Sequence, residues 1–595
     1  MERDLDDEGG DAISLLAEEG DVIAEEVDRD DCVTDDGLGE GHEELVLDDT
    51  GNVHGMAHDS NQEQSSSGKG GLRTMPFIIA NEVLEKISSS GLQSNMVIYL
   101  TREYHMANAA AAVIMLSWGA LSNITPIFGA FLSDSYLGRF RTIAFATISC
   151  FVGLTLMWLT AMIPGAKPQP DSPATPHQMF LLFLSLAFSS IGSAGVRPCS
   201  IPFGADQFTN GNTSDRERTL RVYFNCYYAS VGLSFIFAST VVVYVQDRFG
   251  WKVGFAVPVA LIVASASMFL AGSPMYVKVR SRGSTLTGFC RVVVAAVKNR
   301  SVDLEKRDLV FGYEQGSSEV FLMPSDKLRA CIRRYAGDPR VCTVEQVEDL
   351  KSVIGVLPLW SAGIMVSLVM SQQFGPLQAE AMNRRLGGRF TIPAGSFSVF
   401  QLLTMTLLSA CYDSYILPAV SKLSGRPARL TLKQRMGIGV LISTASTAVA
   451  ALVEAKRRRT EAKRMSALWL VPQYALVGLA EAFSVIGQVE FFYVALPRTM
   501  SSYAVALWTL GLGVSNLIGT ALVKAVQAAT ARGGRPGWLA TDLDEGHYDY
   551  YYWVLTAMGV VDFFYFMVCI WAYGEEVRKK PWEVEGEALV EEQSD

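Results

Sequence analysis

The sequence is poor in charge, cysteine and histidine. Asp, Glu, Lys and Arg make up 19% of its 595 residues, against about 25% in a typical soluble domain. Its nine cysteines and six histidines show no metal-ligand spacing, and no nucleophile motif is present. These shortages argue against a multidomain cytosolic enzyme, a zinc protein and a disulfide scaffold. We therefore expect no enzymatic activity and no bound cofactor or metal.

The charge that is present is unevenly distributed along the chain. Residues 1–70 contain 23 acidic and 3 basic residues, and residues 574–595 contain 8 acidic and 3 basic. The stretch between them has 44 basic and 30 acidic residues, although the whole chain has a net charge of -11. We predict a disordered acidic arm and an acidic tail around a basic, apolar body. The arm lacks the basic and apolar regions of a cleavable signal peptide.

Twelve apolar segments lie in this body, each near the roughly 20 residues needed to cross a bilayer. Six lie in residues 71–275 and six in residues 353–573, with residues 276–352 as a linker between the two sets. This pattern predicts an all-α membrane protein with the major-facilitator fold, in which substrate binds between the halves near the membrane midplane. The predicted helices are 76–100, 108–132, 141–163, 177–202, 222–246, 254–275, 353–374, 395–420, 433–455, 468–495, 502–525 and 549–573.

Basic loops indicate the orientation of these helices in the membrane. The linker and residues 421–435 are rich in Lys and Arg, which favours a cytoplasmic location for them and for both termini. Residues 456–464, KRRRTEAKR, disagree, because six basic residues then fall on the outer side. The plasma membrane is the predicted residence. The vacuolar membrane is the alternative, because residues 11–16 fit an acidic dileucine sorting pattern.

Three charged residues occur together in the first predicted helix. Glu82, Glu85 and Lys86 are spaced i, i+3 and i+4, so they share one helix face. A charge at the centre of a membrane helix costs about 2.5–3.5 kcal/mol on insertion scales, so this face should line a central cavity. Such a cluster can exchange a proton between its carboxylates and its basic partner. The alternative is a static buried salt bridge.

Two further charges lie in apolar helices of opposite halves. Arg197 is in the fourth predicted helix and Glu481 in the tenth, so we predict a gating salt bridge between them. The alternative is that Arg197 extends to the membrane surface. In the loop after the second helix, Asp134, Gly138 and Arg139 predict a turn held by charge.

Several ordered motifs resemble the plant nitrate/peptide transporter family, within the proton-coupled oligopeptide transporters. The resemblance covers about residues 70–575 and includes TMPFIIANEVLEK, GAFLSDSYLGRF, GVRPCSIPFGADQF and WLVPQYALVGLAEAF. It implies proton coupling by Glu82, Glu85 and Lys86, and a conformational role for the loop motif. Arg197 stands where the family usually has a lysine, and Glu481 matches that residue's partner. Because Arg does not release its proton, the carboxylates must handle protons.

Departures from the family pattern bear on the substrate. The seventh helix has no histidine, so nitrate specificity does not carry over, and changes after Lys86 and near Gly232 make di- and tripeptide transport less favoured. We predict a proton-coupled symporter of a small anionic solute such as nitrate. The alternatives are a transporter of peptides, hormones or glycosides, and a nutrient receptor that signals through its cytoplasmic parts. Candidate cavity residues, each with core packing as the alternative, are Tyr104, Tyr227, Tyr228, Gln372, Gln373 and Tyr474.

The expected partners are the solute and the lipid bilayer, with no nucleic acid. Thr142 follows Arg139 and Arg141 in a sequence typical of basic-directed kinases, and it matches a regulatory threonine of a relative. A phosphate there would add about -1.5 to -2 charges beside two arginines. A kinase is thus a candidate partner, and an unmodified threonine is the alternative.

Overall fold

The computed structural model describes the chain from residue 70 to residue 573, with gaps. Residues 1–69 of the predicted acidic arm, residues 279–343 of the predicted linker 276–352, and the predicted acidic tail lie outside the described residues. The described ranges are 70–169, 172–208, 213–278, 344–386, 390–412, 415, 417–424, 430–460, 465–496, 501–531 and 537–573.

The first set of predicted helices is present, and the first four have ends close to those expected, whereas α7 begins nine residues before the predicted residue 222. A proline in the first turn begins α3, and a capping box between Thr175 and Gln178 begins α6. Gly138, with a φ of 76°, ends a π-helical turn (Ser133–Leu137) before α5. The helices are α3 (Met75–Arg102), α4 (Asn108–Leu132), α5 (Arg139–Met162), α6 (Pro176–Ala205), α7 (Thr213–Phe237) and α8 (Val243–Ala271).

The fifth and sixth predicted helices are joined rather than separated by a loop. α7 continues through a π-helical segment (Ala238–Val242) into α8, and the change of direction falls at Gly250 inside α8, where φ is 80°. Glycine adopts this backbone conformation without the steric cost that a side chain imposes. The boundary between the two predicted helices is therefore a kink at Gly250.

The second set contains more breaks than we predicted. A short helix, α11, and a two-stranded antiparallel hairpin follow α10, and the predicted helix 395–420 is divided into α12 and α13. Residues 407–429 belong to a separate unit that holds the end of α12 and α13. The elements are α10 (Val344–Met370), α11 (Phe374–Ala381), β1 (Arg385–Leu386), β2 (Phe390–Thr391), α12 (Ser398–Cys411), α13 (Leu417–Ser424), α14 (Leu432–Arg459), α15 (Val471–Ala495), α16 (Ser501–Thr530) and α17 (Tyr548–Tyr573).

Nine helical segments among the described residues are long and apolar enough to cross a membrane. One of them, Arg218–Ala271, has 54 residues. At about 1.5 Å per residue that is well over twice the thickness of a bilayer core, so it accounts for two predicted helices. α3, which carries Glu82, Glu85 and Lys86, is not among the nine. The all-α membrane fold is confirmed, and the number of twelve crossings stays a prediction.

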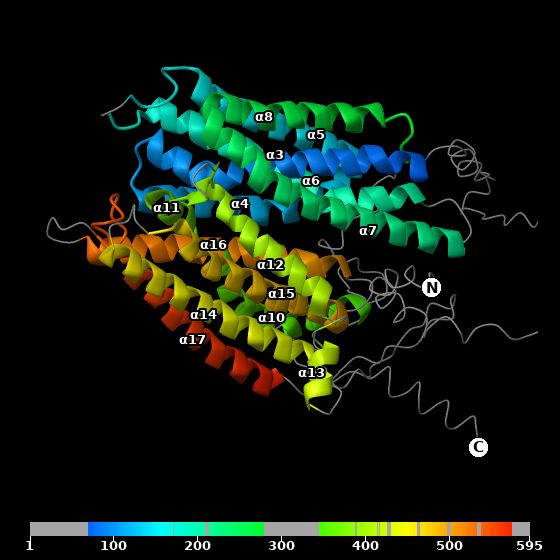
Figure 1. Ribbon diagram of the computed structural model, residues 1–595. Coiled ribbons are helices and arrows are strands. Elements are labelled where there is room, and N and C mark those ends of the chain that lie inside the picture. The colour runs from blue at the N-terminus through cyan, green and yellow to red at the C-terminus, as the bar shows by residue number, and fades with distance from the viewer. Residues whose placement is uncertain are drawn as a thin grey trace, which may run out of the picture. The chain divides into compact units, whose positions relative to one another are not determined.

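Small residues let the helices approach one another closely. Gly129 of α4 lies against the backbone of Ala194 in α6, and Gly153 of α5 lies against Ser189 in α6. Close backbone approach at small residues is typical of membrane helix pairs. Within each set, α5 packs on α6, α3 on α8, and α14 on α15 and α17 (Figure 1). α4 and α16 pack against each other and join the two sets.

Candidate functional site

The charged cluster of α3 is buried and loosely paired. Glu82 and Glu85 are each 1% exposed. The Lys86 Nζ lies 3.5 Å from Glu82 Oε1 and 3.8 Å from Glu85 Oε2, which is longer than a strong ion pair. Glu82 Oε2 and both carboxylate oxygens of Glu85 have no hydrogen-bond partner in the described structure. The cluster thus holds two carboxylates, one ammonium group and few donors.

Side chains of α6 and α7 complete this cluster. Arg197 is close enough to Glu85 to act on it electrostatically, and Tyr223 and Tyr227 are close enough to Glu82 to do so. Tyr227 is 4% exposed, whereas Tyr228, the next predicted cavity residue, is 58% exposed and touches Tyr227 with its ring edge. The sequence predicted Tyr227 without indicating that it lies beside the α3 acids.

The predicted salt bridge between Arg197 and Glu481 is absent from this structure. Arg197 Nη1 donates to Asn123 Oδ1 at 3.2 Å and to the Ser122 carbonyl at 3.5 Å, both on α4. Glu481 Oε2 accepts from Gln401 Nε2 at 3.0 Å. Each charged group is bound by a neutral partner within its own half, so a bridge that forms in one state and breaks in the other stays a prediction.

A cavity of about 60 Å³ lies in the second half, and amide and hydroxyl side chains line it together with apolar ones. Two predicted cavity residues, Gln372 and Tyr474, line it, and Gln372 Oε1 accepts from Tyr551 at 2.8 Å. Gln373 is not among the lining residues, and Tyr104 is 1% exposed in the core against Tyr99. Sequence reasoning missed further polar lining residues, each of which stood out as polar within an apolar helix: Gln401, Ser446, Thr447, Gln473 and Tyr552.

The two halves are joined by ion pairs at the end of the helices where the hairpin lies, which we call the hairpin end. Arg102 at the end of α3 pairs with Glu380 of α11. Arg384, before β1, lies 3.6 Å from Asp247 of α8. The Phe390 ring of β2 stacks on Tyr244 of α8 with 6.3 Å between centroids. In one ion pair the arginine comes from the first half, and in the other it comes from the second half. Together these contacts hold the hairpin end closed.

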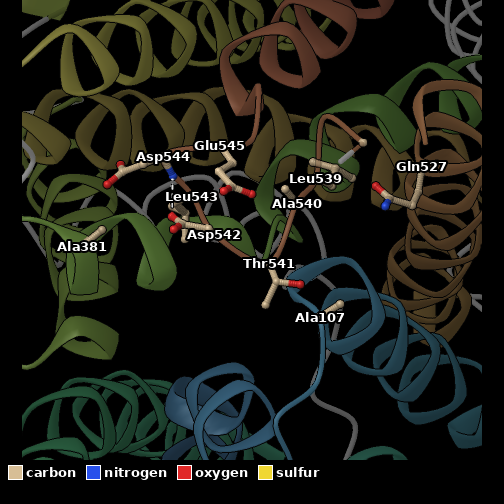
Figure 2. Close-up of a pocket in the computed structure, with 11 residues that line it drawn as sticks. Ala107, Ala381, Gln527, Leu539, Ala540, Thr541, Asp542, Leu543, Asp544 and Glu545 are labelled. Atoms are coloured by element: carbon tan, nitrogen blue, oxygen red, sulfur yellow. Dashed lines mark hydrogen bonds between the residues drawn. The ribbon is translucent and has the colours of Figure 1, made fainter. Parts of the chain in front are cut away.

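A wider pocket of about 700 Å³ also lies at the hairpin end. Figure 2 shows Ala107 before α4, Ala381 at the end of α11, and the segment 539–545 around it. Asn108 Nδ2 donates to the Thr541 carbonyl at 3.0 Å, which attaches this segment of the second half to the first. The segment after α16 therefore belongs to the closed end.

Ion pairs at the opposite end join helices of the same half. Arg139 Nη1 lies 2.7 Å from Asp206 at the end of α6, and Arg139 Nε lies 3.8 Å from Asp134. The turn with Asp134, Gly138 and Arg139 is thus held by charge against a neighbouring helix end. In the second half, Arg435 Nη1 lies 2.9 Å from Glu490.

The structure does not present Thr142 as an accessible phosphorylation site. Its side chain is 5% exposed, and its hydroxyl donates to the Gly138 carbonyl at 3.1 Å. Arg139 is already engaged with Asp206. A kinase could reach Thr142 only after the start of α5 had opened.

The basic run at the end of α14, which disagreed with the predicted orientation, has local partners. Arg457 binds Glu454 and Asp544, and Arg458 Nη1 lies 3.2 Å from Asp549. The Lys456 Nζ lies 3.5 Å from the centroid of the Trp469 ring. These partners offset part of the positive charge at the hairpin end of the folded protein, and the orientation in the membrane stays a prediction.

The chain is a multi-pass helical membrane protein with ionisable groups buried inside each of its halves, an arrangement typical of secondary transporters. The POT family model matches residues 140–539. Two Arabidopsis thaliana proteins, NRT1/PTR FAMILY 1.2 and 1.1, are each 43% identical, covering 87% and 86% of this chain and 92% of each relative. A crystal structure of an auto-inhibited POT family peptide transporter is similar with a TM-score of 0.63 at 18% identity, over 84% of this chain and 96% of that one. The chain belongs to the POT family, as its motifs predicted.

Proposed function

We propose that this protein is a proton-coupled symporter that works by alternating access. The observation that carries the proposal is the α3 cluster, in which Glu85 is buried and neither of its carboxylate oxygens has a hydrogen-bond partner. An ionised carboxylate in such a place depends on Lys86 for its counter-charge. A proton on Glu85 would remove that charge and free Lys86 to move toward Glu82 or toward an anion.

The charges of the same cluster support the proposal that the solute carries an anionic group. Arg197 keeps its charge, and its Nε is buried without a hydrogen-bond partner among the described residues. When Glu85 takes up a proton, the positive charges of Lys86 and Arg197 exceed the negative charge around them. An anion entering at that moment restores neutrality, which couples solute binding to proton binding. Nitrate would meet this charge requirement, and so would the anionic group of an organic solute.

Alternating access is proposed from the contacts between the halves. The pairs Arg102–Glu380 and Arg384–Asp247 close the hairpin end. In the other conformation these pairs would separate, and Arg197 and Glu481 would exchange their present neutral partners for each other. We further propose cytoplasmic termini and a plasma-membrane location, so that the hairpin end faces outward.

The test is uptake into liposomes that contain the purified protein, with an imposed inward proton gradient. Glu82→Gln, Glu85→Gln and Glu481→Gln should each abolish the gradient-driven part of uptake. Glu490→Gln is the matched control, because Glu490 lies on the same helix as Glu481 but is exposed and bound to Arg435. Gradient-driven uptake that persists in all three variants would overturn the proposal.

A further inference from the structure

A buried ion pair lies behind the cavity of the second half. Arg457 and Glu454, both on α14, are each 0% exposed. Arg457 Nε donates to Glu454 Oε2 at 2.9 Å, and Nη2 donates to Oε1 at 2.9 Å. Two parallel hydrogen bonds of this kind hold the carboxylate in one orientation. Glu454 is therefore an ionised acceptor in a fixed position.

Gln378 of α11 takes its orientation from this carboxylate. Its side chain is 0% exposed, and its Nε2 donates to Glu454 Oε2 at 2.9 Å. An ionised carboxylate only accepts hydrogen bonds, so Gln378 must turn its amide nitrogen toward Glu454. Its carbonyl oxygen then accepts from Tyr552 at 3.2 Å and from Gln473 Nε2 at 3.4 Å. Both lone pairs of that oxygen are thereby used.

The orientation of Gln378 fixes the orientation of Gln473, which lines the cavity. Because its amide nitrogen faces Gln378, its carbonyl oxygen is left as an acceptor. That oxygen is buried and has no hydrogen-bond partner in the described structure, and the side chain is only 7% exposed. Gln401, which also lines the cavity, has its amide nitrogen engaged by Glu481 in the same way. Two carboxylates therefore orient two amides of one cavity.

We infer that this cavity binds an N–H or O–H group of the solute. This rests on the proposed function, in which an anionic group is held near Lys86 and Arg197. The solute is then a small organic anion that also carries a hydrogen-bond donor, and a bare inorganic anion is a poor fit. A ligand without a donor leaves the Gln473 carbonyl buried and unpaired, and sites built in this way discriminate strongly against such ligands.

The experiment compares alkylsulfonates with two to four carbons, with and without a terminal hydroxyl, and nitrate. Sulfonates stay ionised at acidic pH, so they do not cross the bilayer as neutral acids. In liposomes with an inward proton gradient, the hydroxylated member of at least one pair should be taken up about tenfold faster, as expected for one well-made hydrogen bond. Equal uptake within every pair, or uptake of nitrate alone, would overturn the inference.

Two variants separate the acceptor from the residue that positions it. Gln473→Leu removes the acceptor, and Gln378→Leu frees the Gln473 amide to turn over. Both should reduce the hydroxyl preference, measured as the ratio of the two uptake rates, to near unity. If the two residues serve only the stability of the fold, the ratio of uptake rates with and without the hydroxyl should not change. Gln373→Leu is the matched control, because Gln373 is a neighbouring amide outside the cavity lining.

The outcomes distinguish this inference from the proposed function. If uptake depends on the gradient and on Glu85 but the preference is absent or unchanged in both variants, only the inference fails. If the hydroxyl preference is present and uptake ignores the gradient, the proposed coupling fails and the cavity assignment stands. Uptake of none of the solutes by folded wild-type protein overturns both.

Discussion

Two buried charge clusters, one in each half, differ in how well their groups are satisfied. In the α3 cluster, Lys86 lies 3.5 Å and 3.8 Å from its two carboxylates, and three carboxylate oxygens have no hydrogen-bond partner among the described residues. In the α14 cluster, Arg457 and Glu454 form two hydrogen bonds of 2.9 Å, and Asp544 and Gln378 add more. Burial alone therefore does not determine how well charged groups are satisfied.

The difference follows from the cost of burying charge. A buried ion pair offsets its desolvation only when its geometry is good and its remaining lone pairs are satisfied. The α14 cluster meets that condition, so its charges are held in one state. The α3 cluster does not, and this is the feature for which we proposed it as the proton-coupling site.

The largest effect is expected from Arg457→Leu. It leaves Glu454 as a buried charge without its bidentate partner, which typically costs about 3–5 kcal/mol of stability. Thermal unfolding of the purified protein in detergent would show a large drop in melting temperature and a lower yield of folded protein. Arg459→Leu, at an exposed position two residues away, is the control. Equal melting temperatures for both variants would show that the ion pair of the α14 cluster does not stabilise the fold.

Glu85→Gln should impair proton-coupled uptake while leaving the stability of the protein nearly unchanged. The substitution removes a buried charge that lacks hydrogen-bond donors, so stability should change by less than about 1 kcal/mol or rise. Solute uptake should no longer respond to the proton gradient. The measurement is melting temperature alongside gradient-driven uptake in the same preparation. A loss of stability as large as that of Arg457→Leu would mean that the α3 cluster is a static pair.

An intermediate effect is expected at the hairpin end. Arg384→Asp opposes Asp247 with a like charge and should weaken closure, which lowers solute affinity several-fold through a shifted conformational balance. The exchange Asp247→Arg with Arg384→Asp should restore most of it. A double-mutant cycle on the half-saturating solute concentration measures the coupling between the two positions. Additive effects would show that this pair does not act as a clamp.

The smallest effect is expected from Lys456→Gln. Its ammonium lies over Trp469 at an exposed position, where cation–π contacts contribute about 0.5–1 kcal/mol. The melting temperature should fall slightly and uptake should be unchanged. If this variant were as destabilised as Arg457→Leu, the basic run would act as one unit rather than through separate partners.

Helix positions and the α3 cluster were predictable because each depends on residues close together in the chain. A run of apolar residues must be helical to satisfy its backbone in a membrane, and the i, i+3, i+4 spacing alone brings Glu82, Glu85 and Lys86 onto one face. The hairpin at residues 385–391 and the break within the predicted helix 395–420 were missed, because local propensity signals such interruptions weakly.

Partnerships between distant residues depended on packing that no local pattern records. Arg197 binds α4 and not Glu481, and Arg457 meets Asp544 across 87 residues of chain. The relay from Glu454 through Gln378 to Gln473 joins three helices, and it appears in the sequence only as polar residues in apolar segments. Composition and spacing predicted the membrane fold and the burial of the α3 charges, whereas the burial of Arg457, in a run expected outside the membrane, was not predicted. Tertiary structure decided which of the buried charges are satisfied, because hydrogen-bond geometry exists only once the helices have packed.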